Sequence, residues 1–128
     1  MKFVTKVHSI LEYLDFNNPD FSNIDDVLQE KITSFLKSDL LKDISKGKIF
    51  KEYEFIYEKD NKLNHGIIDL MIEYSDYIDI IDYKLKNIED ENYIKQLKGY
   101  KEYIKDRTNK KVNLYLYSII DNRFTNIE

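Results

Sequence analysis

The 128-residue sequence contains no cysteine, one proline and three glycines. The absence of cysteine excludes disulfides, zinc–thiolate sites, iron–sulfur clusters and thiol nucleophiles, so any metal must bind to oxygen or imidazole ligands. No apolar run approaches the ~20 residues that span a bilayer, and no apolar signal segment opens the chain. We therefore expect a cytoplasmic protein without a membrane partner.

The sequence also lacks an excess of positive charge, since 24 acidic and 20 basic side chains give a net charge of −4. This balance argues against a protein that simply coats nucleic acid, because a polyanion normally requires surplus lysine and arginine. Hydrophobic residues make up 42% of the chain, which is enough for a core. The length fits a single domain spanning residues 1–128.

Apolar residues at helical spacing predict two helices in residues 1–47. The first covers residues 3–16, with His8 on the inward face formed by Val4, Val7, Leu11 and Leu14. The second covers residues 22–37, with Ser22 or Asn23 as its N-cap. Its apolar stripe consists of Ile24, Val27, Leu28, Ile32 and Phe35.

The pattern then changes to the alternation that is typical of strands. Three segments predict an antiparallel meander: 49–58, 65–74 and 77–84. A helix at 89–107 and an apolar strand at 112–119 follow, and a right-handed crossover makes that strand parallel to the third one. The sequence thus predicts an α/β fold, with a mixed four-stranded sheet flanked by helices in residues 48–119 and a tail at 120–128.

Two aspartates stand inside apolar strands, and a tight turn at Ser75–Asp76 places Asp69 directly opposite Asp82. Like charges about 5 Å apart destabilise a sheet, whereas a divalent cation between them removes the conflict. Lys84 shares the face of Asp82 because side chains alternate along a strand. Oxygen ligands in an incomplete shell suit Mg²⁺, and the lysine would orient water or stabilise developing negative charge. This pattern favours phosphodiester hydrolysis.

A structural ion triad of Asp69, Asp82 and Lys84 is the alternative, and spacing alone leaves both interpretations open. A third acid, Asp79, lies in the same predicted strand as Asp82 and is interpreted as a solvated edge residue or a turn cap. His8 on an apolar face is, taken alone, typical of a core histidine.

Five segments occur in a fixed order within residues 4–119: Val7-His8 with Leu11-Glu12, Lys51-Glu52-Tyr53-Glu54-Phe55, Gly66-Ile67-Ile68-Asp69, Ile81-Asp82-Tyr83-Lys84 and Gln96-Leu97-Lys98-Gly99-Tyr100. Together they resemble the signature of PD-(D/E)XK nucleases, and in particular the RecB-like nuclease domain that ends AddA-type helicase–nuclease subunits. The resemblance implies a restriction-endonuclease-like core.

The resemblance also implies roles for individual residues. It implies four metal ligands: His8, Asp69, Asp82 and the backbone carbonyl of Tyr83. It implies catalytic roles for Asp69, Asp82 and Lys84. Glu52 matches the acid of the first strand, although Glu54 lies two residues further on and is the alternative.

The last predicted helix carries the remaining candidates. Gln96 and Tyr100 share a helix face, where they would border the site, and an inward-facing Gln96 would need a hydrogen-bond partner. Residues 93–111 contain seven basic and two acidic side chains. Lys98, Lys101 and Lys105 follow helical spacing, which fits either a ridge along DNA phosphates or a solvated helix face.

The function implied by the resemblance is a Mg²⁺-dependent deoxyribonuclease of double-strand-break repair and recombination, with Mn²⁺ as an alternative metal. The implied substrate is single-stranded DNA, and the implied partners are a helicase domain or an AddB-like subunit. One rival is a restriction or repair endonuclease that cuts duplex DNA. The other is a non-catalytic DNA-binding or interaction module of the same fold, which retention of Asp69, Asp82 and Lys84 disfavours.

Overall fold

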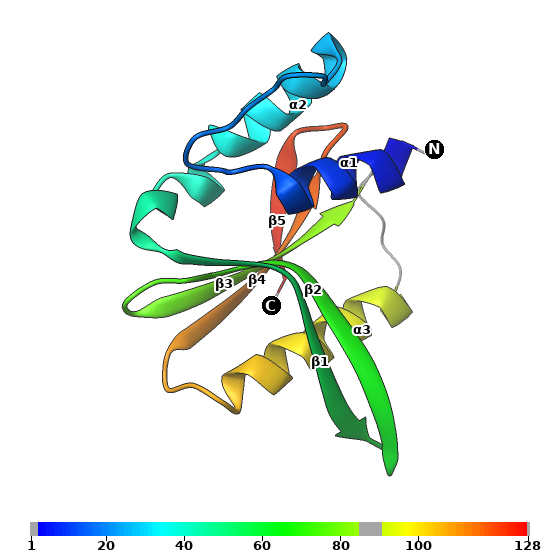
Figure 1. Ribbon diagram of the computed structural model, residues 1–128. Coiled ribbons are helices and arrows are strands. Elements are labelled where there is room, and N and C mark those ends of the chain that lie inside the picture. The colour runs from blue at the N-terminus through cyan, green and yellow to red at the C-terminus, as the bar shows by residue number, and fades with distance from the viewer. Residues whose placement is uncertain (1–2, 85–90, 128) are drawn as a thin grey trace.

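The computed structural model describes residues 3–84 and 91–127, with side chains from residue 6 onward within these ranges (Figure 1). Its elements are, in chain order, helices α1 (Phe3–Tyr13) and α2 (Asp26–Leu36), short 3-10 helices η1 (Asp39–Leu41) and η2 (Ile44–Lys46), strands β1 (Lys48–Lys59), β2 (Lys62–Glu73) and β3 (Tyr77–Lys84), helix α3 (Glu91–Lys105), and strands β4 (Lys111–Ser118) and β5 (Arg123–Ile127). The mixed α/β class is the predicted one. None of the described helices has the length and apolar character needed to cross a membrane.

One sheet has the strand order β1-β2-β3-β4-β5. All neighbouring pairs are antiparallel except β3 and β4, which are parallel, and β4 is an interior strand as predicted. The prediction of four strands and a tail at 120–128 is wrong, because residues 123–127 form β5. That strand carries no buried residue, so hydrophobic alternation does not indicate it.

A tertiary contact explains why the fifth strand forms. Asn122 has the left-handed backbone angle φ 51, which asparagine tolerates in turns, and it reverses the chain between β4 and β5. Its side-chain amide donates hydrogen bonds to the Lys31 carbonyl at 3.2 Å and to the Tyr117 hydroxyl at 3.1 Å. The turn is therefore held by residues outside it, one of them far away in the sequence.

Both hairpins of the meander close over two residues. Asp60 and Asn61 join β1 to β2 with φ 55 and 62, as a two-residue turn of type I′ requires. Ser75–Asp76 joins β2 to β3, and the Tyr74 N–H donates to the Tyr77 carbonyl at 2.8 Å. The pairing of Leu70 with Ile81 confirms the predicted register between these strands.

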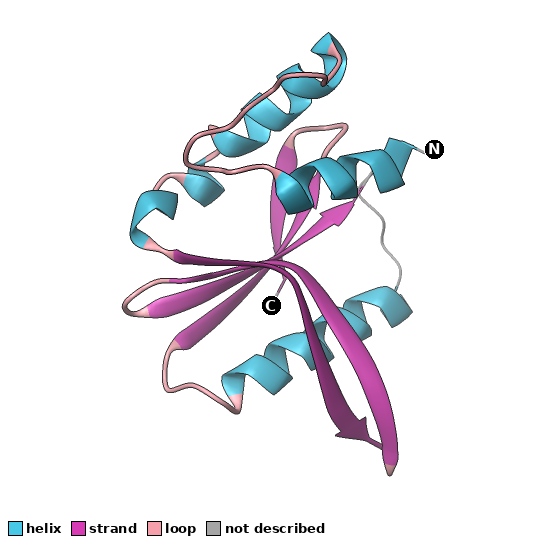
Figure 2. Ribbon diagram, viewed as in Figure 1, coloured by secondary structure: helices cyan, strands magenta, loops and turns pink. Residues whose placement is uncertain are grey.

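Helices cover both faces of the sheet, with α1 and α2 on one side and α3 on the other (Figure 2). The first face buries Leu11, Ile32 and Phe35 against the sheet, and the second buries Leu97 and Ile104. Because both faces of the central strands are covered, an acid in β3 is largely removed from bulk solvent. Asp79 is only 5% exposed, so its interpretation as a solvated residue is wrong.

The second helix begins later than its sequence suggests. Its N-cap is Asp25, whose carboxylate accepts a hydrogen bond from the Leu28 N–H at 2.9 Å, rather than Ser22 or Asn23. Val27 points outward, at 64% exposure, which corrects its predicted place on the buried stripe. Two further predictions, Val4 on the inward face of the first helix and the start of the last helix at residues 89–90, lie outside the described residues and side chains.

Candidate metal centre

The strand β2 changes faces at Asp69. Ile68 and Met71 both pack in the core on the α3 side, whereas Leu70 between them packs on the α1–α2 side. Strict alternation would instead place Ile68 and Leu70 on one face. The alternation of β2 side chains between the two faces of the sheet is therefore offset by one residue at Asp69.

The strand β1 makes the matching shift at Glu52, because Phe50 and Tyr53 both pack on the α3 side. Glu52 has φ 48, a left-handed conformation that non-glycine residues seldom adopt and that concentrates at functional sites. The register is the same before and after it, so Glu52 faces Asp69 across a rung at which the strands are not paired. The carboxylates of Glu52 and Asp69 thus lie together where the side-chain alternation of both strands is interrupted.

The strands β2 and β3 separate at the same point. Their ladder ends at the pair of Leu70 and Ile81, one residue before Asp69 and Asp82 would face each other. Beyond it, Asp69 Oδ2 accepts a hydrogen bond from the backbone N–H of Tyr83 at 2.9 Å. The side chain of Asp69 therefore links the two strands where backbone pairing has stopped.

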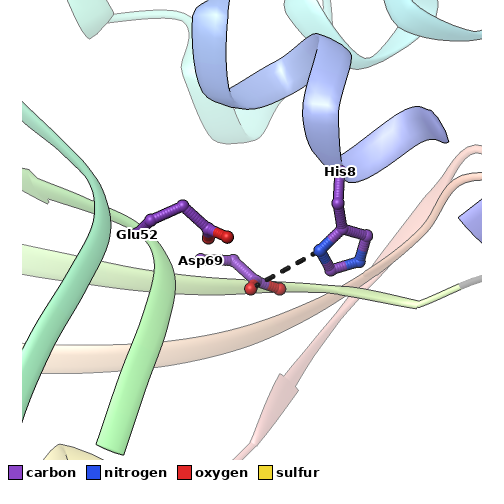
Figure 3. Close-up of side chains that lie close together, drawn as sticks. All are labelled: His8, Glu52 and Asp69. Carbon is purple, nitrogen blue, oxygen red and sulfur yellow. Dashed lines mark ion pairs between the residues drawn. The ribbon is translucent and has the colours of Figure 1, made fainter. Parts of the chain in front are cut away.

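Helix α1 brings a histidine over this opening (Figure 3). His8 Nδ1 lies 3.7 Å from Asp69 Oδ1, and one ligand atom from each of His8, Glu52 and Asp69 lies within 4.8 Å of the other two. The His8 side chain is 30% exposed, so its predicted position on a buried face is only partly met. The structure therefore places it where α1, β1 and β2 meet.

The sheet also holds the end of α1. Lys51, next to Glu52, donates a hydrogen bond to the Leu14 carbonyl, and its Nζ lies 4.0 Å from the centroid of the Phe16 ring. A cation is favourable near the C-terminal carbonyls of a helix. This lysine ties the helix that carries His8 to the strand that carries Glu52, and nothing in the sequence pattern singled it out.

Asp82 and Lys84 complete the opening from β3. Lys84 Nζ lies 3.8 Å from Asp82 Oδ2, and 3.6 Å from the centroid of the Tyr93 ring in α3. The lysine thus lies between a carboxylate and the face of an aromatic ring, both of which attract its ammonium group. Among the described residues, Asp82 is not part of the group formed by His8, Glu52 and Asp69, but it contacts Asp69.

The carboxylates are crowded, and their pKa values show it. Burial raises the pKa of Asp82 to about 8, aided by the charge of Asp69 and a hydrogen bond to it and opposed by Lys84. Burial likewise raises the pKa of Glu52 to about 7, aided by Asp69 and Glu12. A cation among these acids would favour their ionised forms, so the electrostatics fit a metal site.

The donor set of His8, Glu52 and Asp69 fits a divalent metal. It offers one imidazole nitrogen and carboxylate oxygens from separate elements, and carboxylates suit the hard cations Mg²⁺ and Mn²⁺. Burial of a carboxylate is costly unless it is paired, which a cation would achieve. The role of the Tyr83 carbonyl as a ligand stays a prediction.

The structure distinguishes the two candidate acids of the first strand. Glu54 is exposed and pairs with His65, whose Nε2 lies 3.1 Å from Glu54 Oε2, away from the three-residue group. His65 is itself exposed. Glu52 is the acid that lies beside Asp69.

The candidates in α3 separate into buried and exposed residues. Tyr100 is buried, and its hydroxyl forms a hydrogen bond with the Ile67 backbone beside the site. Gln96 is exposed, so its predicted inward position is wrong. The face toward the sheet is formed instead by Leu97, Tyr100 and Ile104.

The three candidate lysines of α3 differ in their relation to a groove beside this helix. Lys98 lines a groove of about 630 Å³ between α3 and the outer part of β1, together with Lys59 and Lys95. Lys101 and Lys105 are not among the residues lining this groove, and Lys101 is half-buried. Of the three lysines, Lys98 is the one that lines the groove, and the ridge along DNA phosphates stays a prediction.

Comparison with known proteins relates the chain to one region of a longer protein. The chain is 35% identical, over 89% of its length, to an ATP-dependent helicase/nuclease subunit of Clostridium beijerinckii. It is 30% identical, over 88% of its length, to the subunit of the same name from Clostridium acetobutylicum. The chain spans only 13% of the length of either relative. No family model matches the chain.

Proposed function

We propose that this chain is a metal-dependent deoxyribonuclease domain, related to the nuclease part of an AddA-type helicase–nuclease, that hydrolyses phosphodiester bonds in DNA repair and recombination. The observation that carries the proposal is the convergence of His8, Glu52 and Asp69 at the break in the sheet, with Asp82 and Lys84 beside them. The similarity to helicase/nuclease subunits supports it.

In this proposal His8, Glu52, Asp69 and Asp82 hold Mg²⁺ or Mn²⁺. When bound, the ion would supply Lewis-acid stabilisation of phosphate charge and would lower the pKa of water. Asp69 also links β2 to β3, because it accepts a hydrogen bond from the Tyr83 N–H. At neutral pH and without a cation, the raised pKa values keep Asp82 and part of Glu52 protonated. A bound metal ion would displace these protons and supply the positive charge that meets the phosphate.

In this proposal Lys84 is the side chain that acts directly on the reacting groups, whereas the acids and His8 hold the metal. Its ammonium group would donate hydrogen bonds to the attacking water or to a phosphate oxygen, where negative charge develops. Asp82 at 3.8 Å and the Tyr93 ring at 3.6 Å fix the position of this charge. Such preorganisation is effective because the group need not reorient during the reaction.

The test is cleavage of labelled single- and double-stranded DNA with Mg²⁺, with Mn²⁺ and with a chelator. We expect metal-dependent cleavage that falls on the order of 100-fold to 1000-fold in Lys84→Met, because one charge-stabilising donor is lost. Asp82→Asn should abolish it. Asp79→Asn in the same strand and Lys62→Met at the hairpin turn are matched controls that should retain activity.

Failure to cleave in either metal would contradict the proposal, as would equal cleavage by Asp82→Asn. A non-catalytic DNA-binding module would bind DNA without metal-dependent cleavage. Preference for duplex DNA would favour the restriction or repair endonuclease over the single-strand nuclease.

We further propose that the groove beside α3 contacts the DNA backbone. Lys98→Glu should weaken binding and reduce the dependence of log affinity on log salt by about 1, because one phosphate contact is lost. Lys105→Glu removes the same charge from a lysine that does not line the groove and should have a smaller effect. Equal effects of the two variants would instead indicate the continuous ridge, and unchanged affinity in both would indicate a solvated helix face.

A further inference from the structure

A second cavity lies on the same face of the sheet as α2, near the turn between β2 and β3. It has a volume of about 460 Å³ and is lined by residues of η1, the turn between β2 and β3, the starts of β3 and β4, and β5. None of the residues assigned to the proposed metal centre lines it. The cavity is therefore separate from the proposed nuclease site.

The most deeply placed polar group of this cavity is the carboxylate of Asp79. Asp79 is 5% exposed, and its Oδ1 accepts a hydrogen bond from the Asn113 side-chain amide at 2.9 Å. The amide supplies a hydrogen bond but no charge, and the charge of Lys111 offsets the cost of the buried carboxylate only in part, because burial is the larger effect and raises the pKa of Asp79. A cation entering the cavity would offset this cost.

Aromatic rings form the walls. The rings of Tyr74 and Tyr77 are 4.6 Å apart at an angle of 31°, and those of Tyr115 and Phe124 are 5.8 Å apart at 83°. Phe124 is 41% exposed, although phenylalanine is among the residues that are most often buried. Aromatic faces carry negative electrostatic potential and attract cations.

The rim is acidic. Asp39, Asp43 and Asp76 line the cavity, against the two basic residues Lys42 and Lys111. Together with Asp79 the acids outnumber the lysines, so phosphate groups are repelled and cations are attracted. This charge argues against nucleic acid as the occupant.

We propose that this cavity binds the guanidinium group of an arginine side chain presented by a partner protein. Guanidinium is planar and weakly hydrated, stacks on aromatic rings, and donates hydrogen bonds to carboxylates. The walls formed by Tyr74, Tyr77, Tyr115 and Phe124 offer the stacking surfaces, and Asp79 offers the acceptor. An ammonium group is more strongly hydrated and uses these flat surfaces less well.

The test is calorimetric or NMR titration of the whole chain with N-acetyl-arginine amide, without metal or DNA. We expect a dissociation constant on the order of 1 mM, as befits a single anchoring side chain. The neutral analogue N-acetyl-citrulline amide, which has nearly the same shape, should not bind. The measurement is independent of nuclease activity, so it is unaffected if the proposed function fails.

Two variants locate the site. Asp79→Asn retains an acceptor for the Asn113 amide but removes the negative charge that would pair with the guanidinium group. It should therefore weaken binding by about tenfold or more. Phe124→Ala removes an exposed wall that the core does not need and should also weaken binding. Asp60→Asn, an exposed acid in the β1–β2 turn, is the matched control and should bind as the native chain does.

Absence of binding at about 20 mM of the arginine amide, a concentration above the expected range, would overturn the proposal. Equal affinity for the citrulline amide would overturn it as well, because charge would then play no part. Unchanged affinity in both cavity variants, with their folding checked by thermal unfolding, would place the ligand elsewhere and reject this site.

Discussion

Two aspartates of β3, three residues apart, show how neighbouring positions acquire different chemistry. Asp79 and Asp82 are both buried, at 5% and 8% exposure. Each is near a lysine, Lys111 for Asp79 and Lys84 for Asp82, but Asp79 also faces an amide and aromatic rings, whereas Asp82 faces a second carboxylate. Burial raises the pKa of both acids, but only Asp82 is raised further by a neighbouring acid. The comparison teaches that the partners of a buried acid, rather than its burial, decide what it can bind.

The largest difference between the two positions should be seen in metal-induced stabilisation. Mg²⁺ or Mn²⁺ at 100 times its dissociation constant should raise the free energy of unfolding by about 2.7 kcal/mol in the native chain. The Asp82→Asn variant should lose most of this gain, whereas Asp79→Asn should retain it. Thermal unfolding with and without metal measures the effect, and equal gains in both variants would remove Asp82 from the metal site.

The pH dependence of stability should separate the two regions next. The folded-state pKa values of Glu52 and Asp82, about 7 and about 8, lie above those of an unfolded chain. The folded state therefore binds more protons than the unfolded state between roughly pH 4 and pH 8, so stability falls as pH rises through this window. The charged groups facing these acids include Asp69, Glu12 and Lys84.

Urea denaturation at several pH values with a chelator measures this slope. Saturating Mg²⁺ should flatten it, because the metal takes the place of the protons. Asp82→Asn should also reduce it in the chelated protein. A stability that does not change between about pH 5 and pH 8, values chosen to lie inside the expected window, would contradict the crowding of these acids.

The smallest expected effect is the change in the free energy of unfolding when Asp79, near the turn between β2 and β3, loses its charge. Burial raises the folded-state pKa of Asp79, so its charge is unfavourable at neutral pH. Asp79→Asn should therefore raise the free energy of unfolding at pH 7 by on the order of 1 kcal/mol. The gain should vanish below about pH 4, where the acid is protonated in both states. A loss of stability at pH 7 would show that the charge is already compensated.

Local patterns predicted most of the fold. Alternating apolar residues located the first three strands, and the weak turn at Ser75–Asp76 was sufficient to set the confirmed register between β2 and β3. The fifth strand was missed because its residues are largely exposed and its turn depends on contacts of Asn122 with Lys31 and Tyr117. Long-range hydrogen bonds of this kind leave no periodic signal in the sequence.

The candidate site was predictable in part. The spacing of Asp69, Asp82 and Lys84 predicted that these residues lie together, and the structure brings them close in space. Spacing could not choose between Glu52 and Glu54, because strict alternation puts both on one face. The left-handed backbone at Glu52 breaks that alternation, and Glu54 turns to His65 instead.

The sequence by itself determined the α/β class, the order of the first strands and the presence of acids inside apolar segments, because these depend on residues close together in the chain. Only the tertiary structure decided where the strands separate, which glutamate lies beside Asp69, and how His8 reaches them from α1. It also decided that Asp79 lies buried in a cavity with aromatic walls. The physical reason is that exposure and electrostatic environment arise from packing between distant segments, which no local pattern contains.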